Sequence, residues 1–242
     1  MSVNAASIAP LGNVGLFMDL TDRLHNRAPH LPGIGVFSGF SGYGKTTSAV
    51  AAANKFKARY VEVGQSWTQA RFLRSLLVEL GGQPKGTIGD MVDAAISHLA
   101  RARVPVIIDE ADHILARRYI ELIRELHDKS GCTIILIGEE MLPQRIAAHE
   151  RVHNRVLSWL QAQPADTDDV AALVKLYAPA VQIAPDLCAL ISERAGGRLR
   201  RVCVSIERVR EWAATQGLKA VSLKEWGDRE LYEGMPAVRR AV

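Results

Sequence analysis

The chain has 242 residues, enough for one α/β domain, a small accessory domain and a buried core. Its content of 48% hydrophobic and 23% charged residues is ordinary for a globular protein and excludes a low-complexity chain. With 30 Lys and Arg against 26 Asp and Glu, the net charge of +4 permits nucleic acid as a partner without demonstrating it.

Cysteine usage and the N-terminus indicate the compartment. The three cysteines lie far apart, each in or beside an apolar segment: Cys132, Cys188 and Cys203. They are typical of small core residues in a reducing compartment, not of a disulfide framework or a zinc site. The N-terminus does not read as a signal peptide, and no apolar run approaches the ~18 residues of a membrane span. We therefore expect a cytoplasmic protein, bacterial or in a phage-infected host, with no membrane contact.

Residues 1–12 are small and polar, and we expect a loose arm there. From 13 to 27, apolar residues such as Phe17, Leu20 and Leu24 recur close to helical spacing and predict a short helix. This helix is placed either to cover the adenine of a nucleotide or to serve packing alone.

A Gly-rich loop follows the first predicted strand, residues 34–38, and precedes a predicted helix. Strand, Gly-rich loop and helix form the order that a phosphate-binding P-loop requires. The glycines let the backbone N–H groups point at phosphate oxygens, and the helix N-terminus adds partial positive charge. Lys45 would reach the β- and γ-phosphates, and the Thr46 hydroxyl would ligate Mg²⁺. The predicted nucleotide-binding residues of this segment are Gly39, Ser41, Gly42, Tyr43, Gly44, Lys45, Thr46 and Thr47.

Two predicted helices, not one, precede the third strand. After a predicted strand over 59–63, helical patterns cover 68–80 and 88–101, with a Gly-rich loop between them. A simple crossover between parallel strands needs only one helix. The extra helix is an insertion that can carry function.

The apolar run 104–108 ends in two carboxylates, Asp109 and Glu110. Such a run predicts a central parallel strand, here expected to neighbour the P-loop strand, whose carboxyl end meets ligands. Asp109 is placed to hold Mg²⁺ through its water shell, and Glu110 to orient or deprotonate the attacking water. Alternatively, the pair supplies favourable charges at a helix N-terminus.

The remaining elements suggest two domains. The pattern predicts one helix over 111–127, a strand over 133–137, a short helix over 141–150 and a last strand over 156–160. Only helices are predicted beyond Pro164, over 166–178, 184–195, 199–214 and 222–231, with Thr167 and Ser222 as N-caps. We expect an N-terminal arm and nucleotide-binding α/β domain over 1–162, followed by a helical lid over 163–242.

With these motifs the chain resembles the AAA+ ATPases. Gly39–Thr46 matches their Walker A motif and Val106–Glu110 their Walker B motif, and the resemblance covers about residues 14–215. It implies a five-stranded parallel sheet flanked by helices, with a small helical lid. It also implies ATP with Mg²⁺, because no guanine-reading Asn-Lys-x-Asp motif is present, and assembly into a ring or helical oligomer, because AAA+ active sites form between subunits.

The resemblance implies roles for further arginines. Arg200, at the start of a lid helix, matches the sensor 2 arginine, with Arg201 as the neighbouring alternative. Arg155 resembles the arginine finger that enters the next subunit's site, and Arg151 lies one helical turn earlier. Such a finger is worth ~10³–10⁵ in rate. All of these residues can equally be surface charges.

One position departs from the family. The polar sensor 1 residue would fall near Gly138-Glu139-Glu140, and a carboxylate there would repel the γ-phosphate. Either Glu139 points away from the nucleotide or hydrolysis is slow without a partner.

Within the family, the chain looks like the transposition helper ATPases, particularly the phage Mu-type transposition protein B group. The short length, the segment Ile137–Leu142 and the Gly-Gly-x-Leu-Arg-Arg lid carry this resemblance. It implies an ATP-dependent oligomer on duplex DNA that stimulates a transposase. Only about thirty residues precede the first predicted strand, so we expect no separate N-terminal helix-turn-helix domain of that group's kind and expect any DNA contacts to come from the core.

The candidates for those DNA contacts are Arg71 and Arg74, three apart on one helix face, and Lys85 in the next loop. The alternative is a solvated helix face. Two other functions stay open. One is a replication initiator or helicase-loader type ATPase with a replication protein as partner, and the other is a nucleotide-dependent protein switch without DNA binding.

Overall fold

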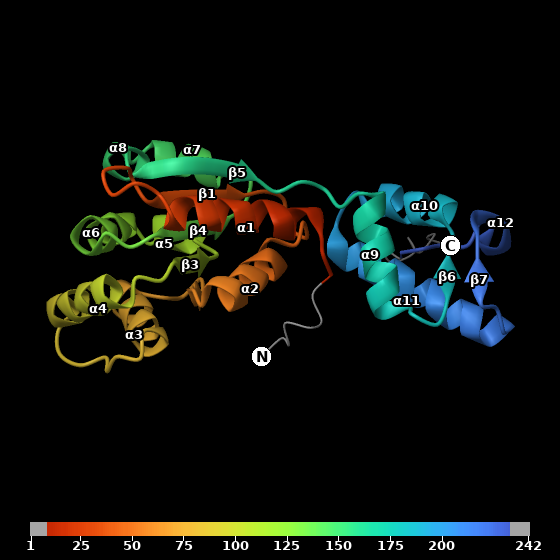
Figure 1. Ribbon diagram of the computed structural model, residues 1–242, viewed down its shortest axis with the longest axis horizontal. Helices are drawn as coiled ribbons and strands as arrows, with labels where there is room; N and C mark the ends of the chain where they lie inside the picture. Colours follow the sequence, from red (N-terminus) through yellow and green to blue (C-terminus); the bar gives the residue numbers. More distant parts are fainter. Residues whose placement is uncertain (1–8, 233–242) are drawn as a thin grey trace, which may run out of the picture. The chain divides into compact units, whose positions relative to one another are not determined.

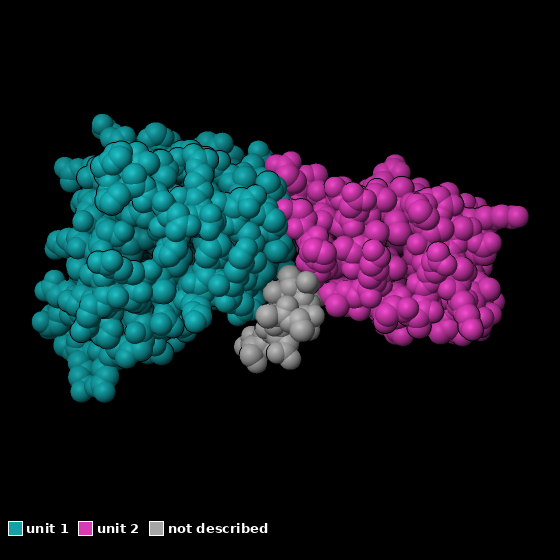
Figure 2. Space-filling view, viewed as in Figure 1, with its two compact units in different colours: residues 1–8, 13–162 teal, residues 9–12, 163–242 magenta. Residues whose placement is uncertain are grey.

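The computed structural model describes residues 9–232 in two compact units (Figures 1 and 2). Within that range, the first unit holds residues 13–162, and the second holds residues 9–12 and 163–232. No helix of the described range is long and apolar enough to cross a membrane.

The first unit is built on a five-stranded parallel sheet with the strand order β2-β3-β4-β1-β5. The strands are β1 (Ile34–Ser38), β2 (Arg59–Glu62), β3 (Val106–Asp109), β4 (Ile134–Gly138) and β5 (Val156–Gln161). Strands β1, β3 and β4 are buried along their whole length, as expected for apolar strands covered on both faces. The predicted sheet is confirmed.

The expected neighbourhood of β1 and β3 is wrong, because β4 lies between them. Ile134 of β4 pairs with Ile34 of β1 on one side and with Val106 of β3 on the other. All three strands are short, mainly apolar runs, so their sequences do not distinguish which pair is adjacent. Because the strands are parallel, Asp109 and the P-loop still meet at the same edge of the sheet.

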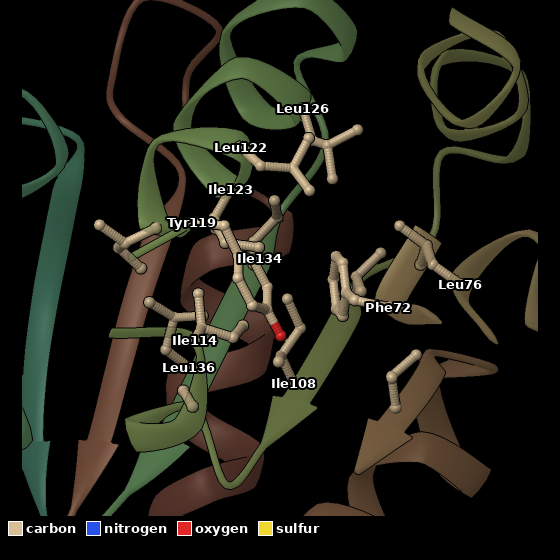
Figure 3. Close-up of a cluster of buried hydrophobic side chains, with 14 of the residues drawn as sticks. Phe72, Leu76, Ile108, Ile114, Tyr119, Leu122, Ile123, Leu126, Ile134 and Leu136 are labelled. Carbon is tan, nitrogen blue, oxygen red and sulfur yellow. The ribbon is translucent and has the colours of Figure 1, made fainter. Parts of the chain in front are cut away.

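Helices cover both faces of this sheet (Figure 1). They are α1 (Gly12–His25), α2 (Lys45–Phe56), α3 (Gln69–Glu79), α4 (Ile88–Ala102), α5 (Asp112–Ala116), α6 (Ile120–Ser130), α7 (Leu142–Ala147) and α8 (Glu150–His153). Alternate residues of β3 join opposite cores: Ile108 packs with Phe72 and Leu126 (Figure 3), and Ile107 packs with Phe17 and Ala49. The two helices predicted between β2 and β3 are confirmed as α3 and α4.

The single helix predicted over 111–127 is wrong, since α5 ends at Ala116 and α6 begins at Ile120. Between them Arg118 has a left-handed backbone, with φ of 59°. No glycine or proline marks this break in the sequence. Tyr119 is buried there with its ring 6.0 Å from that of Phe72, so core packing overrides the local helical pattern.

The second unit contains α9 (Thr167–Tyr177), α10 (Pro185–Ala195), α11 (Leu199–Gln216) and α12 (Leu223–Trp226). It also contains a pair of short parallel strands, β6 (Gln182–Ile183) and β7 (Ala220–Val221), so the expectation of helices alone is wrong. Strands of two residues leave almost no periodic signal in a sequence. The last helix is also shorter than predicted, because it ends at Trp226.

Helix caps refine two predictions in the second unit. Asp166, not Thr167, is the N-cap of α9 and forms a capping box with Asp169. Ser222 caps α12 as predicted. The loose arm is wrong for residues 9–12, where Leu11 is buried and the Gly12 N–H donates to the Asp169 carboxylate (2.7 Å). Residues 1–8 lie outside the described range.

Candidate nucleotide-binding site

The loop after β1 has the backbone that a phosphate cradle needs. Gly42 and Gly44 adopt left-handed conformations, with φ of 88° and 81°, which only glycine adopts without strain. A Cβ atom at Gly39 would lie 2.8 Å from the Cβ of Ala162, so this position also requires glycine. The N-terminus of α2 follows directly at Lys45, where its free N–H groups favour an anion.

The Lys45 ammonium folds back over this loop. Its Nζ donates to the carbonyl oxygens of Gly39 (2.6 Å) and Phe40 (3.0 Å). Burial lowers the pKa of Lys45, and the carboxylates of Asp109, Glu110, Glu139 and Asp112 oppose that shift. A phosphate group would compete with the loop carbonyls for the same protons.

Asp109 joins β3 to the P-loop. Its buried carboxylate accepts hydrogen bonds from Thr46 Oγ1 (2.8 Å), Tyr60 Oη (3.0 Å) and the Glu110 N–H (2.9 Å). Hydroxyl and carboxylate oxygens are the hard ligands that Mg²⁺ takes, so Thr46 and Asp109 fit the metal that the motifs imply. Tyr60 is a site residue that the sequence did not indicate. It lies on β2, where it pairs in register with Ile107 of β3, the strand that ends at Asp109.

Glu110 is exposed and stands in a strained backbone conformation, with φ of 56°. For a residue other than glycine such a conformation costs ~1–3 kcal/mol and is common at functional sites. Desolvation and the neighbouring Asp109 raise the pKa of Glu110, while His113 and Lys45 oppose the rise. A carboxylate of raised pKa accepts a proton more readily than an ordinary one.

The start of α1 also touches the P-loop, which the sequence did not indicate. The buried Asn13 donates from Nδ2 to the carbonyl of Tyr43 (2.8 Å). Tyr43 in turn packs edge-on against Phe40, with ring centroids 5.7 Å apart. A lone asparagine at a helix start reads as a cap, so its long-range contact leaves no sequence signal.

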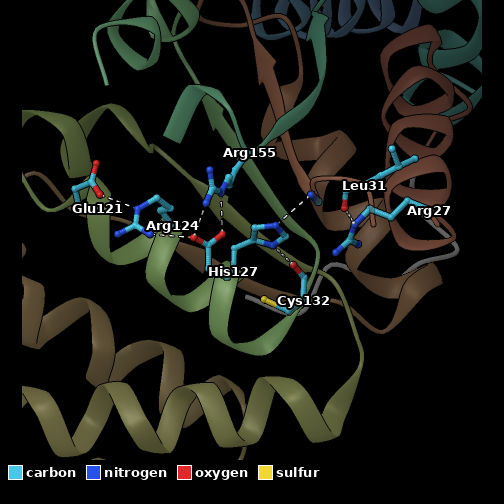
Figure 4. A network of polar contacts seen from close by, with 9 residues as sticks. Arg27, Leu31, Glu121, Arg124, His127, Cys132 and Arg155 are labelled. Atoms are coloured by element: carbon cyan, nitrogen blue, oxygen red, sulfur yellow. Dashed lines mark hydrogen bonds and ion pairs between the residues drawn. The ribbon is translucent and has the colours of Figure 1, made fainter. Parts of the chain in front are cut away.

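The two arginine-finger candidates differ in their surroundings. Arg155 donates from Nε and Nη2 to the two oxygens of Asp128, at 3.0 and 3.2 Å, and Asp128 also pairs with Arg124 (Figure 4). Arg151 is exposed and forms no hydrogen bond or ion pair with any residue in the described range. Arg155 is therefore engaged within its own chain, whereas Arg151 is available to another molecule.

Of the other predicted residues, Arg201 is half-buried and the rest are exposed. In the second unit Arg200 has no polar partner among residues 9–232, while Arg201 stacks over Tyr232 at 5.1 Å. In the first unit, Arg71 and Arg74 lie on the solvent side of α3, and Lys85 lies in the loop before α4. Arg71 stacks over Trp67 at 5.3 Å.

Comparison with known proteins identifies the fold. Residues 28–146 match the sequence model of the AAA domain family, and no curated protein matches the chain. The structure is similar to the ORC2 protein of Aeropyrum pernix in ADPNP–ADP complexes, with a TM-score of 0.64 and 19% identity, over 90% of this chain and 68% of that one.

Two further solved structures show the same fold. The ORC1 protein of Aeropyrum pernix in complex with DNA matches with a TM-score of 0.62 and 17% identity, over 86% of this chain and 61% of that one. The RuvB Holliday junction branch migration motor of Thermotoga maritima matches with a TM-score of 0.60 and 17% identity, over 89% and 67%. The match over residues 28–146 and these structures agree on the fold, and the chain has the P-loop AAA+ fold that its Walker A and Walker B motifs predicted.

Proposed function

We propose that this protein binds ATP with Mg²⁺ and hydrolyses it. The observation that carries the proposal is the contact between Thr46 and Asp109, which brings the P-loop and the end of β3 within one hydrogen bond. Lys45 would leave the loop carbonyls for the β- and γ-phosphates, and Thr46 and Asp109 would hold the metal, directly or through its waters. The ion would neutralise charge that develops on the phosphates. Glu110 would take the proton of the attacking water.

Two substitutions test this site. Lys45→Ala is expected to abolish ATP binding, measured by calorimetry, because it removes the charge facing the phosphates. Glu110→Gln is expected to keep binding and to lower turnover by ~10²–10⁴-fold, because it removes the base. Unchanged turnover in both variants would overturn the proposal.

We also propose that the ATPase acts on duplex DNA in transposition, oligomerising on target DNA without sequence specificity and stimulating a transposase. The support is the sequence resemblance of Ile137–Leu142 and of the lid, together with exposed basic residues on α3. In the oligomer Arg151 would enter the neighbouring site, Arg155 being paired with Asp128. Arg200 would contact phosphate from the lid.

DNA binding is tested with a matched pair of double variants. Arg71→Ala with Arg74→Ala is expected to weaken ATP-dependent retention on duplex DNA. It should also reduce the slope of log K against log salt concentration by an amount that corresponds to about two phosphate contacts. Arg23→Ala with Lys55→Ala removes the same charge from exposed positions on α1 and α2 and should leave retention unchanged. Equal losses in both double variants would contradict a DNA-contacting α3.

The second candidate is a replication initiator or helicase-loader type ATPase. The observation favouring it is that two helices, α3 and α4, lie between β2 and β3, one more than a simple crossover needs; the initiator-like clade also has an additional helix there. The partner separates the two proposals. Specific stimulation by a transposase supports transposition, and specific binding of a helicase supports replication. ATP turnover without DNA retention at any salt concentration would instead favour a protein-directed switch.

A further inference from the structure

The turn after β3 and the end of β4 are joined by hydrogen bonds beyond the last paired residues of these strands. The Ala111 N–H donates to the Ile137 carbonyl (2.8 Å), and the Glu139 N–H donates to Asp112 Oδ2 (2.7 Å). The backbone at Glu139 is therefore held by a side chain three residues beyond Asp109.

Asp112 is buried and fully engaged. It is 6% exposed, and its Oδ1 accepts a hydrogen bond from Arg145 Nη1 of α7 at 3.0 Å. A Cβ atom at Gly138 would lie 2.2 Å from Asp112 Oδ2, so the carboxylate reaches the backbone only because this residue is glycine. The close approach leaves little freedom for the residue that follows.

Glu139 stands next to the phosphate loop. Gly138 pairs with Ser38, the last residue of β1, and the next residue, Gly39, accepts the hydrogen bond from Lys45. The Glu139 side chain is exposed and forms no hydrogen bond or ion pair within the described range. Its charge contributes to raising the pKa of Lys45 against the effect of burial.

The other carboxylates at this edge differ in their partners. Asp109 accepts bonds from Thr46 and Tyr60, and Asp112 is paired with Arg145. Glu110 is assigned above to the attacking water. Glu139 is the carboxylate of this group with neither a partner among the described residues nor a step in hydrolysis. A fixed negative charge beside bound phosphates disfavours them, the more so the more charge they carry.

Building on the proposed ATP-binding function, we propose that Glu139 selectively weakens triphosphate binding by charge repulsion, and that Asp112 is the positioning residue that holds it beside the P-loop. The site then discriminates less in favour of ATP over ADP than its P-loop alone would. We call this repulsion of the triphosphate by Glu139 the restraint. A cation brought by a second copy, such as Arg151, would offset the Glu139 charge and thereby couple ATP occupancy to assembly.

Glu139→Gln tests the restraint, with Glu140→Gln as the matched control because it makes the same chemical change one residue further on. Calorimetry with Mg²⁺ gives the Kd of ATP and of ADP for each variant. Glu139→Gln is expected to lower the Kd of ATP roughly tenfold and the Kd of ADP by less. Glu140→Gln is expected to keep the ratio of the two Kd values within about twofold of the wild-type ratio. An unchanged ratio in Glu139→Gln, or equal shifts in both variants, would overturn the proposal.

Asp112→Asn and Arg145→Gln test the positioning role. Either change is expected to shift the ATP to ADP ratio in the direction of Glu139→Gln, and adding Glu139→Gln to Asp112→Asn should bring little further gain. If Asp112→Asn fails to fold, judged by its melting curve, Arg145→Gln decides, because the Arg145 side chain is 51% exposed. Wild-type ratios in a folded Asp112→Asn protein and in Arg145→Gln would refute the role of Asp112.

The same titrations separate the two proposals. If the wild-type protein binds neither nucleotide, the proposed ATPase function fails and the restraint fails with it. If the wild-type protein binds ATP and Lys45→Ala does not, while Glu139→Gln leaves the ratio unchanged, only the restraint is refuted.

Discussion

At the scale of single residues, the buried His127 of α6 shows how a side chain ties distant segments together (Figure 4). Its Nε2 accepts the Gly33 N–H (3.2 Å) while its Nδ1 lies 2.7 Å from the Cys132 carbonyl, so the neutral ring carries its proton on Nδ1. Desolvation lowers the pKa of His127, although the Cys132 carbonyl opposes this. The charged groups that also act on the ring are Arg27, Asp128 and Arg155.

This ring predicts a pH dependence of stability. Below pH 6.5, the ordinary pKa of histidine, His127 is protonated in the unfolded chain while the buried ring of the folded protein stays neutral. The free energy of unfolding therefore falls as the pH drops. The slope is at most about 1.4 kcal/mol per pH unit. In urea titrations between about pH 5 and pH 8, His127→Gln should show a shallower decline than the wild type. Parallel curves for the two proteins would contradict the assignment.

Tyr119 offers the opposite case, a polar group without a partner. Its buried hydroxyl has no hydrogen bond among residues 9–232, and desolvation raises its pKa to about 12 (Figure 3). Because an unsatisfied buried group costs ~1–3 kcal/mol, Tyr119→Phe is expected to leave stability unchanged or to raise it by up to that amount. Tyr60→Phe, which removes the hydrogen bond to Asp109, should instead lower stability. Chemical denaturation of both variants makes the comparison.

At the scale of elements, an ion pair links α6 to the residue just before β5. Arg155 and Asp128 share two hydrogen bonds, and Arg124 joins the same carboxylate. Within α6, charge pairs spaced three and four residues apart support the helix in the same way. Such a network, partly exposed to solvent, contributes modestly to stability.

The two arginines near α8 are therefore expected to behave differently. Arg155→Ala should lower the free energy of unfolding by about 1 kcal/mol or less, whereas Arg151→Ala should leave it unchanged. Conversely, Arg151→Ala should lower turnover of the assembled protein far more, if it is the residue that enters a neighbouring site. Urea titration and steady-state ATPase assays of the same preparations test both halves. If only Arg155→Ala lost turnover, Arg155 and not Arg151 would be the arginine finger.

At the scale of the whole molecule, the proposed ATP-dependent oligomer predicts that ATP and Mg²⁺ control assembly. Sedimentation velocity should show larger species with ATP and Mg²⁺ than with ADP, and excess chelator should return the protein to its smallest form. Lys45→Ala should stay small under all three conditions, because it lacks the charge that faces the phosphates. The same size distribution under all three conditions in the wild-type protein would contradict this coupling.

Local patterns in the sequence determined much of the outcome. Apolar runs predicted the five strands, and glycine spacing predicted the phosphate loop, because burial on both faces and left-handed turns each need particular residue types at short range. Helical patterns over residues 68–80 and 88–101 also predicted α3 and α4. The roles of Arg151, Arg200, Arg71, Arg74 and Lys85 stay predictions.

Only the tertiary structure decided the rest. It placed β4 between β1 and β3, broke the helix at Arg118, and brought Asn13 and Tyr60 to the P-loop and Asp109. It also paired Asp112 with the backbone of Glu139. These features depend on contacts between residues far apart in the chain, where a short-range pattern carries no information, so packing and long-range hydrogen bonds alone select them.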